Sequence, residues 1–411
     1  MPKLLFISAT IFLAFLTAPK CFVDASKTVV PLMSSTTSHG YTTPKTPTTP
    51  FNFTTDYTSD VYASTVSAGT ELGTTPRFDG PDWAWHPIPW TLVTKAQMVT
   101  AIIGVVGNTL VIVVISQRRG LNRSTDILIG ALATADAITS LSVLPRPFVA
   151  RVPNTFWAYL YCKIIYGRLL LWSSITASIY TLVAISFDRF FAITFPLIFK
   201  RLVSTGKVNA CIVLIWICAA CMSCQGLFVV TVNVESRSCV IQHASSSSQL
   251  VMGSFIFVCR LVLPTTCMLV TQLLIARALY QQSRRFSGDT SSSTTGGSVH
   301  LAARNRVIKM MLIVIIVYII CWGPNQIFYF GLNAGFISFA YLNGPLHILF
   351  IVIAYANSCV NPIIYAACHP QFRAALKNLI KGFRIQNESS SVFAHKDDIP
   401  NTKSTKSSLV K

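Results

Sequence analysis

Residues 349–365 read LFIVIAYANSCVNPIIY, an apolar run that ends in the polar signature Asn361-Pro362-Ile363-Ile364-Tyr365. A second apolar run, earlier in the chain, ends in Asp188-Arg189-Phe190. Hydrocarbon offers no water to a backbone group or a charge, so polar groups near membrane depth are costly and usually functional. The two runs therefore indicate a membrane protein whose spans carry a function.

Seven apolar runs of this kind cross the chain of 411 residues, at 94–116, 126–149, 159–191, 209–231, 250–278, 307–332 and 343–366. Each run reaches the roughly 20 residues that a bilayer demands. The chain is 52% hydrophobic and only 11% charged, whereas soluble domains carry about 25% charged residues. We therefore predict an all-α membrane protein, with a bundle of seven transmembrane helices over residues 89–367.

The formal net charge is +19, and the basic residues follow a pattern. They lie between runs one and two, three and four, and five and six, and after run seven: Arg118, Arg119, Arg123, Lys200, Arg201, Lys207, Arg277, Arg284, Arg285, Arg304, Arg306, Lys309, Arg373, Lys377, Lys381 and Arg384. This positive-inside pattern predicts a multi-pass plasma-membrane protein with an extracellular N-terminus and a cytoplasmic C-terminus. Nucleic-acid binding is the rival explanation of a basic chain, but short juxtamembrane loops do not suit it.

The segments outside the bundle have their own compositions. Residues 1–25 are typical of a cleaved signal peptide; the alternative, an uncleaved anchor, would add an eighth span and misplace the basic loops. Residues 26–88 are rich in Ser, Thr and Pro and indicate a disordered extracellular stalk. Its sequon at Asn52 predicts N-glycosylation.

The chain after the last run divides in two. Residues 368–384 repeat apolar side chains at helical spacing opposite a basic face, which predicts an amphipathic helix on the anionic lipid of the inner leaflet. Residues 385–411 are polar and rich in Ser, as expected of a disordered cytoplasmic tail that is phosphorylated.

The remaining runs carry further motifs, namely Gly107-Asn108, Leu132-Ala133-Thr134-Ala135-Asp136, Trp216, Pro264 and Cys321-Trp322-Gly323-Pro324. With the two signatures above, they make residues 94–384 resemble a rhodopsin-like (class A) G-protein-coupled receptor. The segments Gly323-Pro324-Asn325-Gln326 and Ala356-Asn357-Ser358-Cys359 resemble neuropeptide receptors of the somatostatin, galanin and allatostatin kind. The resemblance implies a receptor and not an enzyme, and no soluble-enzyme motif is present.

The resemblance also implies partners and a switch. The partners would be an extracellular peptide ligand, a heterotrimeric G protein, arrestin and receptor kinases. Residues of the switch would be Asp188, Arg189, Phe190, Trp322, Pro324, Asn361, Pro362 and Tyr365. At rest Arg189 should pair with Asp188, and on activation it should swing toward Tyr365 and the G protein. The alternative is a static arginine that snorkels at the membrane interface.

Two positions near this arginine depart from the family pattern. Phe190 replaces the commoner tyrosine, and Arg304 stands where many family members carry an acid that clamps the arginine. A basic residue cannot form that clamp. We therefore predict that Arg189 is only weakly held in the resting state and that the receptor signals appreciably without ligand.

Asp136 lies in the middle of the second run, where a lone charge costs at least ~2.5–3.5 kcal/mol. The resemblance implies that it binds a sodium ion together with Ser178, Asn357, Ser358 and Asn361. The alternative is a protonated, hydrogen-bonded carboxyl without an ion. No other cofactor is expected.

Cys162 and Cys239 are the two cysteines expected at the outer face, and the resemblance implies that they form a disulfide. Cys162 lies two residues earlier than the family pattern places it, so the geometry of the bridge is an open question at this point.

The side chains in the outer half of the predicted bundle, called the upper bundle here, limit the class of ligand. Leu171 stands where amine receptors keep an aspartate, and Tyr355 stands where opsins keep the retinal lysine, so an amine is disfavoured and retinal is excluded. The candidate ligand-binding residues are Arg146, Arg168, Leu171, Trp172, Arg260, Gln326 and Tyr355.

Three of these candidates, Arg146, Arg168 and Arg260, are basic, and the upper bundle carries no acid. One reading is a pocket for an anionic group. The other is that the arginines bond backbone carbonyls, Gln326 or Asn325. A peptide receptor, a receptor for an anionic small molecule or lipid, and a non-signalling scavenger all stay open, whereas a transporter would need paired broken helices that the sequence lacks.

Overall fold

The computed structural model describes residues 83–117, 123–242, 245–288, 295–342, 344–368 and 372–378. The signal peptide, residues 26–82 of the stalk with Asn52 and the tail beyond residue 384 lie outside these residues. Residues 83–88, the last of the predicted disordered stalk, are described and contain a β-strand over Ala84–His86, so this part of the prediction was wrong.

Seven helical segments of the described chain are long and apolar enough to cross a membrane, which confirms the prediction. Four are formed by single helices: α3 (Leu92–Ser116), α4 (Arg123–Val143), α12 (Thr295–Asn333) and α13 (Pro345–Cys368). The other three are composite. The third span consists of α5 (Phe156–Leu160), η2 (Tyr161–Tyr166) and α6 (Leu169–Thr194), and the fourth consists of α8 (Thr205–Ser223) and α9 (Gly226–Val229). The fifth consists of α10 (Ser246–Phe257), η3 (Val258–Val262) and α11 (Leu263–Gly288). The short helices α7 (Pro196–Leu202) and η4 (Phe339–Tyr341) lie between successive spans.

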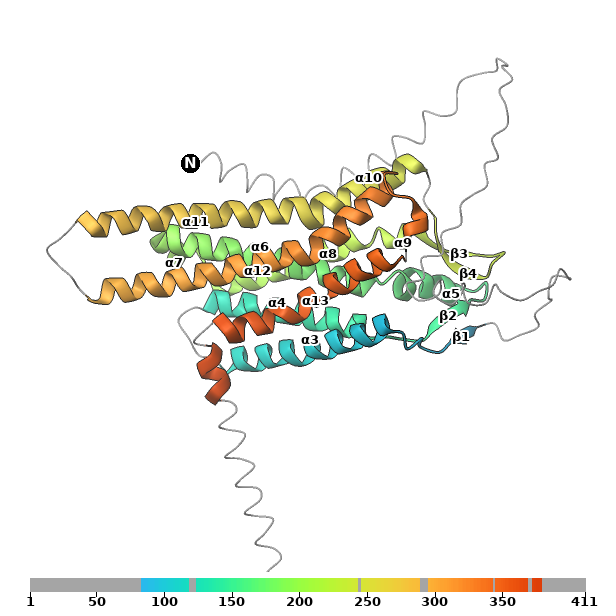
Figure 1. Cartoon of the computed structure of the whole chain (residues 1–411), viewed down its shortest axis with the longest axis horizontal. Coiled ribbons are helices and arrows are strands. Elements are labelled where there is room, and N and C mark those ends of the chain that lie inside the picture. Colours follow the sequence, from blue (N-terminus) through green and yellow to red (C-terminus); the bar gives the residue numbers. More distant parts are fainter. Residues whose placement is uncertain are drawn as a thin grey trace, which may run out of the picture.

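The seven spans pack side by side as one elongated bundle (Figure 1). Helix α6 contacts α4, α8 and α11, α3 packs on α4 and α13, and α13 packs on α12. The core between them holds large apolar side chains with almost no exposed surface, such as Leu132, Leu182 and Ile315. Apolar side chains also cover the outside of the bundle, as expected of helices that face lipid.

Two antiparallel two-stranded sheets lie at one end of the bundle, which we call the pocket end (Figure 1). Strand β1 (Ala84–His86) pairs with β2 (Phe148–Arg151), and β3 (Val230–Asn233) pairs with β4 (Ser238–Ile241). The β3–β4 turn is held by Asn233, whose side-chain oxygen accepts hydrogen bonds from the backbone N–H groups of Glu235 (2.9 Å) and Ser236 (3.1 Å). These strands were not predicted from the sequence.

The third span is not the continuous helix predicted over 159–191. The π-helix η2 ends at Gly167, and Arg168 adopts a left-handed conformation (φ 52°, ψ 41°) before α6 begins. A Cβ atom at Gly167 would lie 2.6 Å from the carbonyl oxygen of Lys163, so the turn requires glycine. The wide π turns and the break take up the two extra residues between Cys162 and Arg189.

The fifth span also contains a π-helix, η3, placed directly before Pro264. Proline has no N–H, so it cannot donate to the carbonyl of Arg260 four residues earlier or to that of Cys259 five residues earlier. The irregular turn is therefore a consequence of the proline, and it leaves two carbonyls for other donors.

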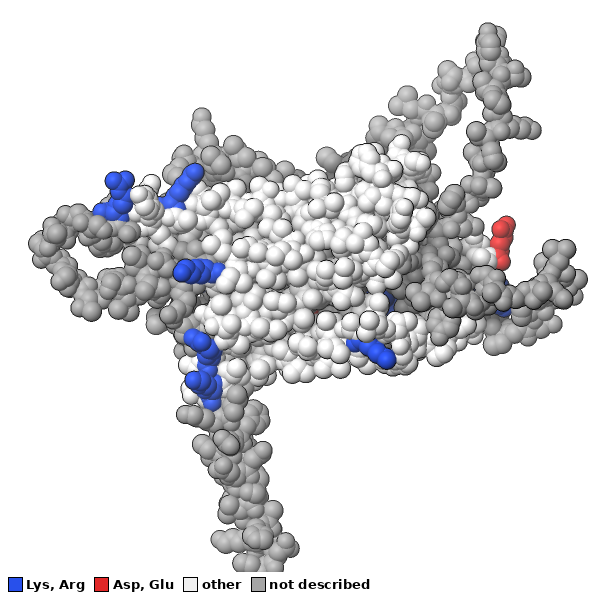
Figure 2. Space-filling model, viewed as in Figure 1, with Lys and Arg blue, Asp and Glu red and all other residues white. Residues whose placement is uncertain are grey.

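The opposite end of the bundle, where Arg189 lies, is called the switch end here. Figure 2 shows most of the visible Lys and Arg side chains gathered there, in agreement with the predicted basic loops. Residues 372–378, part of the amphipathic helix predicted over 368–384, are helical. Phe372 is buried and Leu376 packs on the core, whereas Arg373 and Lys377 are exposed. The described turns are therefore amphipathic, as predicted.

Candidate functional site

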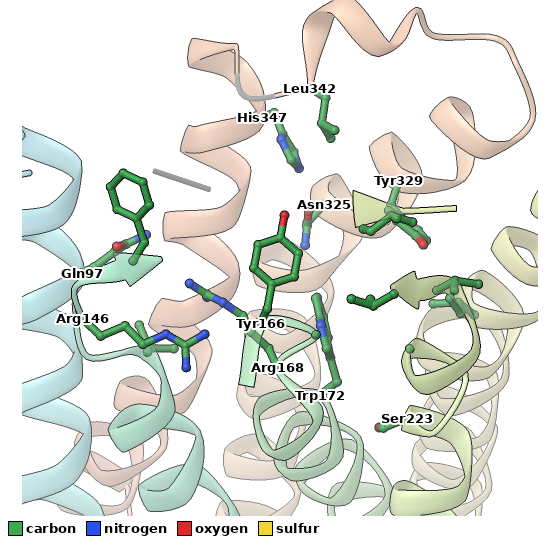
Figure 3. Close-up of a pocket in the computed structure, with 18 of the residues that line it drawn as sticks. Gln97, Arg146, Tyr166, Arg168, Trp172, Ser223, Asn325, Tyr329, Leu342 and His347 are labelled. Carbon is green, nitrogen blue, oxygen red and sulfur yellow. The ribbon is translucent and has the colours of Figure 1, made fainter. Parts of the chain in front are cut away.

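A cavity of about 230 Å³ opens at the pocket end, between the helices and beneath the strands (Figure 3). The third, fifth, sixth and seventh spans all contribute to its wall. Among the described residues that line it, Arg146, Arg168 and Arg260 carry positive charge and none is Asp or Glu. The structure therefore brings the three arginines predicted from the sequence to a single cavity.

The break in the third span sets the direction in which the side chain of Arg168 points. A left-handed residue other than glycine costs ~1–2 kcal/mol, and strain of this kind is typical of functional sites. The side chain turns into the cavity (Figure 3), where Nη1 lies 3.2 Å from the hydroxyl oxygen of Tyr355 and donates a hydrogen bond to it.

Arg146 follows the end of α4 and lies next to Arg168 in the cavity (Figure 3). Its Nη2 donates a hydrogen bond of 2.7 Å to the backbone carbonyl of Ile165, in η2. Arg146 reaches solvent, but the surrounding protein, and then the charge of Arg168, lower the pKa of its guanidinium. Two like charges are thus held close together.

Arg260 lies deeper, in η3, and is only 4% exposed. Its Nε donates to the hydroxyl of Thr176 at 3.1 Å, and its guanidinium carbon lies 4.9 Å from the ring centroid of Trp172. A cation over an indole face is stabilised by the ring quadrupole. Neither contact supplies a negative charge.

Two of the predicted ligand-binding residues are placed differently. Leu171 is buried in the core and does not line the cavity; Trp172 lines it instead, because the break at Arg168 sets the rotation of α6. Tyr355 does not line the cavity either, but its hydroxyl oxygen accepts the hydrogen bond from Arg168. Gln326 is in the wall as predicted, and its buried side-chain oxygen accepts no hydrogen bond within the described chain.

The predicted disulfide is present and closes one side of the pocket end. Cys162 in η2 bonds to Cys239 in β4, with the Cα atoms 5.5 Å apart. Val149, Val152, Ala158, Val230 and Val232 pack around it in a small apolar cluster. The bridge therefore fixes the hairpin to the third span above the cavity.

A buried polar cluster lies at the centre of the bundle around Asp136, which has no exposed surface. Ser178 donates to Oδ1 of Asp136 at 2.7 Å, and Asn361 donates to Oδ2 at 2.8 Å. Ser358 and Asn357 are buried nearby on α13. In the described part of the chain no basic residue pairs with this carboxylate, so a proton or a cation must neutralise it.

The donor set suits sodium in chemical type, because carboxylate and hydroxyl oxygens are hard ligands. Both carboxylate oxygens of Asp136, however, already accept hydrogen bonds from Ser178 and Asn361. Each of these oxygens, and the Ser178 hydroxyl oxygen, keeps a further lone pair with which it would hold a sodium ion.

The two carbonyls left by Pro264 accept hydrogen bonds from tyrosines of neighbouring spans. Tyr180 of α6 donates to the carbonyl of Cys259 at 3.0 Å, and Tyr318 of α12 donates to that of Arg260. Trp322 follows Tyr318 by one helical turn and is fully buried. The backbone of a pocket residue is therefore bonded directly to the sixth span.

At the switch end Arg189 pairs with its neighbour Asp188, as expected for a resting state. Nη2 and Nε of Arg189 lie 2.9 and 3.3 Å from Oδ2 of Asp188. Thr125 of α4 donates to the same oxygen at 2.7 Å. Phe190 is buried in an apolar cluster with Phe195, Ile275 and Leu279. The side chain of Arg304 lies outside the described ones.

The remaining switch residues are spread along the sixth and seventh spans, from Pro324 beside the pocket residue Asn325 to Tyr365, which packs on Phe372. Tyr365 is buried and its ring packs against Phe372, with centroids 6.3 Å apart. Pro324 and Pro362 lie inside α12 and α13, and prolines at such positions kink a helix. In the described structure Tyr365 is thus engaged with the surface helix and not with Arg189.

A family model described as "7 transmembrane receptor (rhodopsin family)" matches residues 107–365, which is more than half of the chain. The chain belongs to the rhodopsin family of seven-transmembrane receptors. The match contains the Asp136 cluster, the Asp188–Arg189 pair and the Asn361–Tyr365 motif.

Curated relatives of this rhodopsin-family receptor are also receptors. Growth hormone secretagogue receptor type 1 of Oryctolagus cuniculus is 27% identical over 304 residues, which cover 70% of this chain and 80% of the relative. The allatostatin-A receptor of Bombyx mori is 27% identical over 291 residues, or 68% and 76% of the two chains. Trace amine-associated receptor 7e of Mus musculus is 28% identical over 306 residues, or 71% and 82%. The relatives thus include neuropeptide receptors.

Three residues that matter to this receptor's site were missed in the sequence: Thr125, Tyr180 and Tyr318, which make the contacts described above. Asn108, noted in the sequence only as part of a motif, donates to the carbonyl of Ser358 at 2.8 Å and so joins α3 to α13. Only Pro264 gave a signal, because a proline inside a span implies unpaired carbonyls that need donors.

Proposed function

We propose that this receptor binds an extracellular peptide in the cavity at the pocket end and activates a heterotrimeric G protein at the switch end. The observation that carries the proposal is the Asp188–Arg189 pair, held at the end of the bundle opposite the cavity. A ligand that favours one of two bundle arrangements can shift their populations, and the G protein then meets the favoured one.

Several features of the cavity favour a peptide. It offers donors in Arg146 and Arg168, an aromatic wall in Trp172 and Tyr329, and the unpaired oxygen of Gln326. A peptide carries carboxylates, apolar side chains and backbone N–H groups that would complement these three kinds of surface. The allatostatin-A receptor among the relatives supports the same class.

The proposed change at the switch end begins with Arg189. Release of its bond to Asp188 would free the guanidinium to turn toward Tyr365 and the G protein. Asp188 would keep its bond from Thr125, which offsets part of the penalty of an unpaired carboxylate. Arrestin and receptor kinases would then recognise the activated receptor and its Ser-rich tail.

We propose that sodium is the ion that neutralises Asp136 in the resting receptor, held with Ser178 and by the amide and hydroxyl side chains of Asn357, Ser358 and Asn361. When bound, the ion would supply a positive charge in the bundle core and favour the resting arrangement. The chain's own residues provide the oxygen ligands and exclude water, since all five are buried.

A second candidate is a receptor for an anionic small molecule or lipid, favoured by the three arginines of the cavity. A non-signalling scavenger is a third, and the paired Asp188 and Arg189 argue against it. In each case we place the pocket end outside the plasma membrane, because the basic side chains gather at the switch end.

A signalling screen separates these candidates. Cells expressing the receptor with a promiscuous G protein are exposed to a peptide library and to a library of acidic metabolites and lipids. We expect responses to peptides and their loss in an Arg189→Ala receptor that still reaches the cell surface. Responses that persist in that variant would contradict the proposed switch, and responses to acidic metabolites alone would favour the second candidate.

A further inference from the structure

We infer that the peptide presents a carboxylate to Arg260, which binds it through the two terminal nitrogens of its guanidinium group. The inference rests on the proposed function and names the chemical group of the ligand that the deep part of the cavity takes. The carboxylate is either the C-terminal one of the peptide or that of an acidic side chain.

The first support is the set of hydrogen-bond donors that Arg260 leaves unused. Its Nε donates to the hydroxyl of Thr176, and within the described chain the side chain of Arg260 makes no other hydrogen bond. Nη1 and Nη2 carry four more N–H groups. Neither of these atoms is sealed inside the described structure without a partner, and Arg260 lines the cavity. The four N–H groups are therefore open to a molecule in the cavity.

The second support is that two neighbouring amides do not occupy the guanidinium. The sequence allowed Arg260 to bond Gln326 or Asn325, and both line the same cavity. The buried side-chain oxygen of Gln326 accepts no hydrogen bond within the described chain, and Arg260 donates to Thr176 and not to Asn325. The acceptor for the terminal nitrogens is therefore left for a ligand to supply.

The third support is the charge of Arg260. The residue is only 4% exposed, and the side chains that contact its guanidinium group, Thr176 and Trp172, are neutral. No acidic residue of the described ranges forms an ion pair with it. A charge inside a membrane bundle is costly until it is paired. An anionic group should therefore bind here more tightly than a neutral group of the same shape.

The fourth support is that the guanidinium group is fixed in place by two neighbouring spans. Trp172 and Thr176 hold it from α6, with the guanidinium carbon 4.9 Å from the ring centroid of Trp172. Tyr318 of α12 holds the backbone carbonyl of the same residue. Stacking covers the face of a guanidinium and leaves its edge free, so Nη1 and Nη2 can donate to the two oxygens of one carboxylate. Little conformational freedom is lost when they do.

The neighbouring wall indicates what is attached to the carboxylate. Met252 and Ile256, earlier in the fifth span, line the cavity together with Arg260, and Trp172 and Tyr329 add two aromatic rings to it. Such a wall suits an apolar side chain next to the anionic group. An amino acid with an apolar side chain is therefore a suitable probe of this part of the cavity.

The test uses purified full-length receptor in detergent and two matched pairs of probes. N-acetylphenylalanine and its carboxamide represent a C-terminal carboxylate and its neutral counterpart. The α-amides of N-acetylaspartate and N-acetylasparagine do the same for an acidic side chain. The melting temperature is measured over a concentration series of each probe, for the wild type and for the variants Arg260→Gln, Arg260→Lys and Arg151→Gln. Arg151 is an exposed arginine of β2 outside the cavity wall and serves as the matched control.

We expect the acid of at least one pair to bind wild-type receptor at least about tenfold more tightly than its neutral counterpart, as charge-assisted hydrogen bonds imply. The pair with the larger difference identifies the source of the carboxylate. The difference should vanish in Arg260→Gln, whereas the neutral probe should still bind and so show that the cavity is intact. It should persist in Arg151→Gln. Equal binding of acid and neutral probe by the wild type, or a difference that survives in Arg260→Gln, overturns the inference.

The variant Arg260→Lys decides the case in which Arg260→Gln fails to fold or binds neither probe. Lysine keeps the charge but cannot offer two parallel N–H groups, so its preference for the acid should be smaller than that of the wild type but still present. A folded lysine variant without that preference overturns the inference. Because the assay needs no G protein, its outcome is independent of whether the signalling proposal holds.

Discussion

The hydroxyl of Tyr318 in the sixth span donates a hydrogen bond to the backbone carbonyl of Arg260, whose side chain lines the cavity in the fifth span. Tyr180 of the third span makes the corresponding bond to the carbonyl of Cys259. The missing N–H of Pro264, together with the change from π-helical to α-helical bonding at this proline, leaves both carbonyls without their helical donors. Three spans are therefore joined at the turn of the fifth span that bears the pocket residue Arg260.

Replacing Tyr318 with phenylalanine should destabilise the receptor by about 1–3 kcal/mol, because a buried carbonyl loses its donor. The measurement is thermal unfolding of the purified receptor in detergent. Tyr341→Phe is the matched control, since Tyr341 is 65% exposed, and it should have little effect. A Tyr318→Phe receptor as stable as the wild type would show that the carbonyl finds another donor.

A double-mutant cycle tests the role of the proline. Pro264→Ala restores an N–H that can reach the Arg260 carbonyl, so Tyr318→Phe should cost less in that background than in the wild type. Strictly additive effects on the unfolding free energy would mean that Pro264 and Tyr318 do not act on the same carbonyl.

Asp136 gives a prediction about salt. If sodium neutralises it in the resting state, wild-type basal nucleotide exchange should fall when choline chloride is replaced by sodium chloride. Asp136→Asn should be insensitive to the replacement, since an amide needs no counter-ion. If the rate of nucleotide exchange by the wild type does not depend on sodium, Asp136 is instead a protonated carboxyl, hydrogen-bonded to Ser178 and Asn361.

The disulfide gives a prediction about stability. Cys162 and Cys239 close a loop with a sequence separation of 77, and loss of such a bridge typically costs about 2–4 kcal/mol. The Cys162→Ser/Cys239→Ser receptor should melt at a lower temperature than the wild type. Reducing agent should lower the melting temperature of the wild type toward that of the variant. A melting temperature unaffected by both changes would mean that the hairpin is held by its apolar cluster alone.

The switch end gives a prediction about basal signalling. Arg304 cannot clamp Arg189, so Arg304→Glu should lower nucleotide exchange in the absence of ligand by supplying an acid. Arg306→Glu, two residues along the same helix, changes the net charge equally and is the control. Equal effects of the two variants would point to net charge and not to a specific clamp.

How far the sequence could anticipate this site depends on the kind of residue. Asp136, Arg189 and Asn361 could be placed because polar residues in long apolar helices have few explanations, and their spacing is fixed by the bilayer. The left-handed Arg168 could not, because that conformation is expected of glycine or asparagine and is set here by tertiary contacts. The error over Leu171 follows from it, since the break changes which face of α6 meets the cavity.

The contacts of Tyr180 and Tyr318 illustrate a second limit. Pro264 shows in the sequence that a carbonyl needs a donor, but the donors come from residues 84 and 54 positions away in the chain, and only packing decides which hydroxyls reach it. The π turns in the third span are equally hidden, because they depend on how extra residues are absorbed and not on a local preference.

Coupling between the cavity and Arg189 is the property on which the proposed function depends most. The direct measurement is guanine-nucleotide exchange on purified heterotrimeric G proteins by receptor reconstituted in lipid discs. Peptides found active in cells should accelerate exchange by the wild type, and Arg189→Ala should abolish the acceleration while still binding the same peptides. Undiminished acceleration by Arg189→Ala, or none by the wild type with any G protein, would contradict a switch built on this arginine.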